Sequence, residues 1–106
     1  MNNFEKNDFV VELFDIYKEF LTSKQKKYFE FYFFEDFSLQ EIAEEHEISR
    51  AAVFDSIKNA IKLLEECEQK IGSLNLLKNL QNIINQYKDN DNLVVQEILK
   101  KIEKEI

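Results

Sequence analysis

The residues best suited to chemistry in this 106-residue chain lie in one stretch, Ser38–Lys62. Its second half holds the side chains that suit a nucleic acid: Ser49, Arg50, Ala51, Phe54, Lys58 and Lys62. Arg50 can donate to a guanine edge or to a phosphate, and the two lysines suit phosphates. Phe54 can contact a thymine methyl group or stack on an unpaired RNA base. This set predicts a surface that binds DNA or RNA.

Two helices must hold these side chains in place. Ser38 and Glu41 have the spacing of a capping box, in which each side chain pairs with a backbone N–H at a helix start. His46 and Glu47 follow as a turn, and Ser49 is a second N-cap. Apolar residues recur at helical spacing on both sides of the turn: Leu39, Ile42, Ala43, Val53, Ile57 and Ala60. The pattern predicts a helix-turn-helix, whose second helix enters the major groove in DNA-binding proteins.

The charge of the stretch opposes a simple DNA-binding interpretation. The whole chain has a net charge of −7, and residues 38–62 hold five acidic against three basic side chains. A DNA-binding unit of this size normally has a basic footprint. A second interpretation therefore stays open, in which Arg50 pairs with a nearby glutamate and the motif is only a packing scaffold.

A basic cluster precedes the motif at Lys24, Lys26 and Lys27. Lys24 and Lys27 share one helix face, so they and Ser38 are predicted to contact a nucleic-acid backbone, as the helix before a recognition helix often does. The alternative is a solvated face without a ligand.

The run from residue 28 to residue 37 is unusually aromatic, with seven aromatic residues in ten. One helix face cannot hold them all, so part of the run is predicted to be core. The excess, at Phe31, Phe33 and Phe34, is predicted to form a homodimer or partner interface, since exposed apolar patches mark partners. Base stacking is a weaker alternative, because no lysine or arginine is interleaved after Lys27.

No residue pattern indicates catalysis, a metal or a cofactor. The chain has one His, one Cys and one Gly, and it lacks a P-loop, a Gly-rich loop and a nucleophile–base pair. His46 is expected to be solvated or to cap a helix, and Cys67 to be a small buried hydrophobe. No apolar run approaches the roughly 20 residues of a membrane span, and no signal peptide is seen. The expectation is a soluble cytoplasmic protein that is not an enzyme and does not contact a membrane.

The elements add up to an all-α fold with about six helices, because the chain has no Pro and a single Gly. Residues 1–7 are predicted to be a frayed end, and Asp8 to cap a helix that runs to residue 21. Further helices are expected over residues 22–35, from Ser38, and from Ser49 to residue 71, where Gly72 ends the helix. Ser73 is then predicted to cap a fifth helix, and a turn over residues 88–92 leads to a sixth. We expect a single domain over 1–106, with a helix-turn-helix core over 22–71 and a helical pair over 73–106.

Several motifs resemble a known family in register. They are Leu13-Phe14-Asp15, Leu21-Thr22-Ser23-Lys24-Gln25, Glu35-Asp36-Phe37-Ser38, Ser49 to Asp55, and Leu63 to Lys70. Residues 21–66 resemble region 4 of sigma-70-type factors, of the winged-helix-like DNA-binding superfamily. Over residues 9–71 the match is closer to the YlxM-like family of small helix-turn-helix proteins.

The resemblance implies a regulatory protein of the signal recognition particle pathway, with DNA or the particle's RNA as its ligand. The alternative is an adaptor that binds no nucleic acid, whose acidic surface meets a basic protein such as the particle's GTPase. The chain departs from the family at Glu47, where members usually carry Gly. If the turn keeps its geometry, Glu47 must adopt a positive φ, which is unfavourable for a residue with a side chain.

Overall fold

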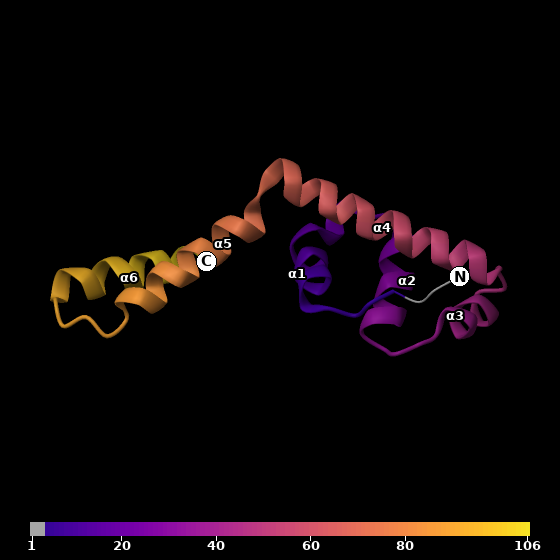
Figure 1. Ribbon diagram of the computed structural model, residues 1–106, viewed down its shortest axis with the longest axis horizontal. Coiled ribbons are helices and arrows are strands. Elements are labelled where there is room, and N and C mark those ends of the chain that lie inside the picture. Colours follow the sequence, from indigo (N-terminus) through magenta and orange to yellow (C-terminus); the bar gives the residue numbers. More distant parts are fainter. Residues whose placement is uncertain (1–3) are drawn as a thin grey trace. The chain divides into compact units, whose positions relative to one another are not determined.

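The computed structural model describes residues 4–106 (Figure 1). Within that range all regular secondary structure is helical, which confirms the predicted all-α class. The elements are α1 (Asp8–Tyr17), the short 3-10 helix η1 (Lys18–Phe20), α2 (Ser23–Phe33), α3 (Leu39–Glu45), α4 (Arg50–Ile71), α5 (Ser73–Tyr87) and α6 (Leu93–Glu105). The chain divides into two compact units, the first ending at Ile71 and the second spanning Gly72–Ile106. We call them the head and the hairpin.

Both predicted capping boxes are present in the head. At the start of α2, the Gln25 backbone N–H donates to Thr22 Oγ1 at 3.1 Å, and the Thr22 N–H donates to Gln25 Oε1 at 2.9 Å. At the start of α3, Ser38 and Glu41 exchange the same two bonds, each 3.0 Å long. These reciprocal bonds satisfy donors that a helix start otherwise leaves unpaired.

The first helix differs from the prediction at both ends. Its N-cap is Asn7, whose Oδ1 accepts from the Val10 N–H at 3.0 Å, and not Asp8. Asp8 lies instead in the first turn, where a negative charge suits the helix dipole. The α-helix ends at Tyr17 and continues only as η1, because Leu21 is buried in an extended conformation that leads into the Thr22 cap.

Residues 4–7 pack against the rest of the head and are not the frayed end that the sequence predicted. The other residues of that predicted end, 1–3, lie outside the described chain. Lys6 Nζ lies 2.9 Å from Asp36 Oδ1 and 4.7 Å from the centre of the Tyr32 ring. The Tyr32 hydroxyl donates to the Phe4 carbonyl oxygen at 3.0 Å. A cation over an aromatic face and a hydrogen bond together hold this segment against α2.

The core of the head, over the described residues, combines aliphatic side chains with six aromatic ones. α4 packs against α1, α2 and α3 (Figure 1). Aromatic rings from α1 and α2 are buried in the core that these helices enclose. Phe29 stacks on Phe14 and on Phe33, with ring centroids 4.3 Å apart in each pair. Of the seven aromatic residues in the run from 28 to 37, Tyr28, Phe29, Tyr32 and Phe33 are buried in the head. Three of the four tyrosines, Tyr17, Tyr28 and Tyr32, are also buried there.

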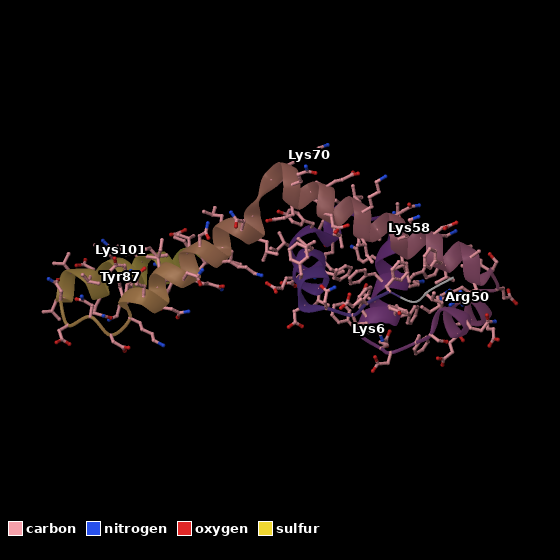
Figure 2. All side chains as sticks on the ribbon, in the orientation of Figure 1. Lys6, Arg50, Lys58, Lys70, Tyr87 and Lys101 are labelled. Atoms are coloured by element: carbon pink, nitrogen blue, oxygen red, sulfur yellow. The ribbon has the colours of Figure 1, made fainter. Side chains whose placement is uncertain are left out.

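The hairpin consists of α5 and α6, joined by the predicted turn. Gly72 has φ +73°, the left-handed conformation expected of the residue that ends α4. In the turn, Gln96 Nε2 donates to the Asn90 and Lys88 carbonyl oxygens at 2.7 and 3.1 Å, and Asn92 caps α6. Tyr87, labelled in Figure 2, is the one tyrosine of the hairpin and is 43% exposed. None of the helices described here has both the length and the apolar character needed to cross a membrane.

Candidate nucleic-acid interface

The turn between α3 and α4 has the predicted helix-turn-helix arrangement. The Ile48 N–H donates back to the Ala43 carbonyl oxygen at 3.0 Å, which closes the C-terminal end of α3. Ser49 Oγ accepts from the Ala52 N–H at 3.0 Å and so caps α4. Between them Glu47 has φ +55°, as expected if the turn keeps the family geometry without its glycine. The turn is therefore held by caps on both sides of one strained residue.

The inner face of α4 is the predicted one, since Val53, Ile57 and Ala60 are fully buried. On the other side, Ala51, Asp55, Lys58 and Lys62 are exposed and fall on one stripe at helical spacing. Figure 2 labels Arg50 at the start of this helix and Lys58 about two turns further on. The stripe is mixed in charge, because the Asp55 carboxylate lies between the small Ala51 and the two lysines.

Two predicted contact residues are less accessible than the stripe. Arg50 is half-buried at the first position of α4. Phe54 is also half-buried, because the Phe4 ring stacks on it with centroids 4.7 Å apart. Sequence reasoning did not predict this contact, since 49 residues separate the two rings and no local pattern links them. The Phe4 ring thus covers part of Phe54 and restricts the approach of a base to it.

The predicted backbone contacts lie on other helices. Lys24 and Lys27 are exposed on α2, and Lys27 lines a shallow depression that also includes Lys26, Glu30 and Phe31. Ser38 is exposed, but both its backbone N–H and its hydroxyl are engaged in the capping box.

The aromatic residues predicted to form a partner interface are mostly occupied. Phe33 is buried in the core and so presents little surface to a partner. Phe31 is half-buried and stacks on Phe37, with centroids 5.1 Å apart. Only Phe34 is largely exposed, at 51%, and its ring still lies 5.6 Å from that of Phe14.

His46 is the C-cap residue of α3, as one of its two predicted roles requires, but its side chain is half-buried and not solvated. Its ring lies 5.2 Å from the Tyr28 ring and 5.4 Å from the Phe31 ring, and its Nε2 is buried without a hydrogen-bond partner in the described chain. The His46 side chain therefore packs against α2 and does not cap a helix end. Cys67 is half-buried, near the expected inward stripe of α4. Within residues 4–106, no three His, Cys, Asp or Glu side chains group as metal ligands.

One titratable group of the motif has a shifted pKa. Glu41 accepts a hydrogen bond from the Ser38 backbone N–H, and the Ser38 hydroxyl acts on it as well. Both favour the charged carboxylate and lower the pKa of Glu41 below its ordinary value of 4.5. The carboxylate is thus tied to the start of α3.

These features define a small all-helical protein built on a helix-turn-helix. Residues 4–106 match the model of a family described as "Putative helix-turn-helix protein, YlxM / p13 like", and the chain belongs to this family. UPF0122 protein YlxM of Bacillus subtilis is 45% identical over 85 residues, which cover 80% of this chain and 77% of that protein. UPF0122 protein lin1916 of Listeria innocua is 46% identical over 83 residues, covering 78% and 76%. A UPF0122 protein of Mycoplasma capricolum is 48% identical over 89 residues, covering 84% and 79%.

Proposed function

We propose that this chain is a cytoplasmic regulatory protein of the signal recognition particle pathway that binds DNA or the particle's RNA through α3 and α4. The observation that carries the proposal is the exposed stripe on α4, where Ala51 is followed by Lys58 and Lys62. A small residue at the start lets a nucleic-acid backbone approach closely. The lysines that follow can then contact successive phosphates.

Arg50 and Ser49 supply the N-terminal end of this surface. In a helix-turn-helix protein, the first residues of the second helix lie closest to the base edges. Arg50 occupies that position and can donate to a guanine or a phosphate. Lys24 and Lys27 on α2 are the further cations proposed to reach the backbone, on the exposed side of that helix.

The charge of the head makes this binding depend on short-range contacts. Residues 1–71 hold 16 acidic and 9 basic side chains, so the head carries the whole net charge of −7. Long-range attraction to phosphates, which drives non-specific binding, is therefore missing. Binding must come from a few cations close to the ligand, and removing them should weaken it strongly.

The double variant Arg50→Ala, Lys58→Ala tests the proposal. Binding of labelled duplex DNA and of the particle's RNA is measured by fluorescence anisotropy at several salt concentrations. The variant should lose at least about 30-fold in affinity, since two contacts worth about 1–3 kcal/mol each are removed together, and it should show a smaller salt slope. The control Lys100→Ala, Lys104→Ala removes the same charge from α6 of the hairpin and should bind like the wild type. A wild type that shows no salt-sensitive binding to either nucleic acid contradicts the proposal.

The same excess of negative charge favours a second candidate function, that of an adaptor for a basic protein such as the particle's GTPase. Glu41, Glu44 and Glu45 are exposed on α3 and line a shallow depression together with Phe37. An acidic rim around an apolar ring suits a basic partner with an apolar side chain. This is tested by a pull-down with the purified GTPase in the presence of nuclease. The double variant Glu44→Lys, Glu45→Lys should no longer bind the GTPase, whereas the double variant Arg50→Ala, Lys58→Ala should still bind it. Capture of the GTPase by the Glu44→Lys, Glu45→Lys variant at the wild-type level would contradict this candidate function.

A further inference from the structure

The hairpin has more apolar surface than its two helices bury between themselves. Within residues 72–106 only Leu74 and Leu99 are buried. On α5, Leu77, Leu80 and Ile84 are half-buried, and Val95 and Ile102 match them on α6. These residues form one apolar stripe on each helix. Since isolated helices of 15 and 13 residues are marginal in water, this single layer of contacts is a weak basis for stability.

Each helix also carries a second apolar stripe that is exposed. Its residues are Leu76, Ile83 and Tyr87 on α5 and Val94 and Ile98 on α6, all between 43% and 63% exposed. Spacings of seven, four and four residues keep each set on one side of its helix and are typical of the seams of helical bundles. We call these five residues the outer stripe.

A groove connects the outer stripe to the interior of the hairpin. It has a volume of about 230 Å³ and is lined by Ile83, Tyr87, Val95, Ile98, Leu99 and Ile102, all of them apolar or aromatic. Exposed apolar surface with an apolar groove marks a docking site for another protein surface. Because the lining has no charged side chain, the occupant must present apolar side chains to it.

The charges of the chain indicate a second copy as this occupant. The hairpin holds five basic and five acidic residues and is neutral, whereas the head carries −7. Two copies of the chain therefore repel each other through their heads but not through their hairpins. A basic protein or a nucleic acid gains nothing electrostatically from a neutral surface. A second hairpin offers the same apolar stripe, and a two-fold axis makes such a stripe its own complement.

We propose that two copies of the protein associate through their hairpins into a four-helix bundle that buries the outer stripe of each. Four antiparallel helices around one apolar core are a stable solution for helices with a broad apolar face. The interface lies on the hairpin and not on the aromatic residues of α2, where Phe33 is already buried. The proposal does not depend on what the head binds.

The mass of the full chain in solution tests this. Light scattering after size exclusion at micromolar concentration should give twice the 12.7 kDa of one chain. In a dimer of Ile98→Glu, or of Ile98→Lys, residue 98 of each protomer brings the same charge into the shared interface. Each variant alone should therefore be a monomer. Mixing the two variants should restore a dimer, because the charges are then opposite. Phe20→Glu is the matched control, since Phe20 is an exposed aromatic residue of the head and its loss should leave the dimer intact.

Three results would overturn the proposal. The first is a wild-type mass of one chain at every concentration, which would mean that the outer stripe stays free or is covered within its own chain. The second is a dimer that survives both Ile98 variants but is lost in Phe34→Glu, which would place the interface on α2. The third is two monomeric, helical Ile98 variants that fail to associate when mixed. Circular dichroism of each variant shows whether the helices are retained.

Discussion

The ring of Phe4 lies stacked on the ring of Phe54, with centroids 4.7 Å apart and planes inclined by 17°. The Phe4 ring also meets Tyr32 edge-on, with centroids 6.0 Å apart. The segment before α1 is thus packed between the second helix of the helix-turn-helix and α2. It takes part in holding α4 and shields an aromatic ring that the sequence assigned to nucleic-acid contact.

Replacing Phe4 by Ala should lower the free energy of unfolding by about 1–2 kcal/mol, because aromatic pairs contribute about 0.5–1.5 kcal/mol beyond the area they bury. Urea denaturation followed by circular dichroism measures the change. Phe20→Ala is the control, since Phe20 is 61% exposed and lies 6.4 Å from its nearest ring partner, Tyr17. Equal losses in the two variants would show that the Phe4–Phe54 stack adds nothing.

Under the proposed function, the same variant has a second effect. Removing the Phe4 ring uncovers Phe54, so affinity for single-stranded RNA should rise in Phe4→Ala while affinity for duplex DNA changes less. Anisotropy titrations with both ligands compare the two. An unchanged RNA affinity would argue that Phe54 is only a core residue.

The substitution Glu47→Gly should raise the free energy of unfolding by about 0.5–1 kcal/mol. A left-handed residue with a side chain costs about 1–2 kcal/mol, and part of the gain is lost because glycine makes the unfolded chain more flexible. The reciprocal variant Gly72→Ala should lower the same free energy. Since nothing lies within 4 Å of the added Cβ, backbone strain alone accounts for that loss. If Glu47→Gly is less stable than the wild type, the Glu47 side chain makes a contact that offsets its strain.

Glu41→Gln should remove a pH-dependent part of the stability. Because the folded-state pKa of Glu41 is lowered, its contribution is fully present above the ordinary value of 4.5 and is lost as the pH falls through the lowered pKa. Glutamine keeps the capping bond without titrating, as Gln25 does in α2. The difference in urea midpoint between wild type and variant should therefore shrink as the solution is acidified. Gln25→Glu should introduce the same pH dependence at α2, and its absence there would contradict the capping explanation.

His46→Phe should raise the free energy of unfolding by about 1 kcal/mol, because an unpaired buried polar atom costs about 1–3 kcal/mol and the new ring keeps the contacts with Tyr28 and Phe31. Thermal and urea denaturation measure the gain. His46→Leu also removes the nitrogen but gives up the ring contacts, so it should gain less. A loss of stability in both variants would show that Nε2 is hydrogen-bonded in solution.

Local signals predicted most of the fold. The capping boxes at Thr22 and Ser38 were readable because both partners lie within three residues of each other. The inward face of α4 was readable from its 3.6-residue period. The exposure of Ala51, Lys58 and Lys62 follows from the same period, so this part of the candidate site was also accessible to sequence reasoning.

The features that the sequence did not reveal depend on long-range packing. The Phe4 ring and the Lys6 ammonium find partners about 30 to 50 residues away, and no spacing rule connects them. His46 is polar and follows a helix, which suggests solvent, yet rings from α2 close over it. Phe33 lies in a run too aromatic for periodicity to separate core from surface. Each of these positions was decided by which helices pack together.

The distribution of aromatic residues gives the protein two optical signals that distinguish its parts. The chain has no tryptophan, and three of its four tyrosines are buried in the head. Near-ultraviolet circular dichroism therefore reports chiefly on the head, while the far-ultraviolet helical signal sums over both units. If the two signals do not change together during denaturation, the head and the hairpin unfold separately. The intact chain can thus be used to measure the stability of each unit, without truncation or an added label.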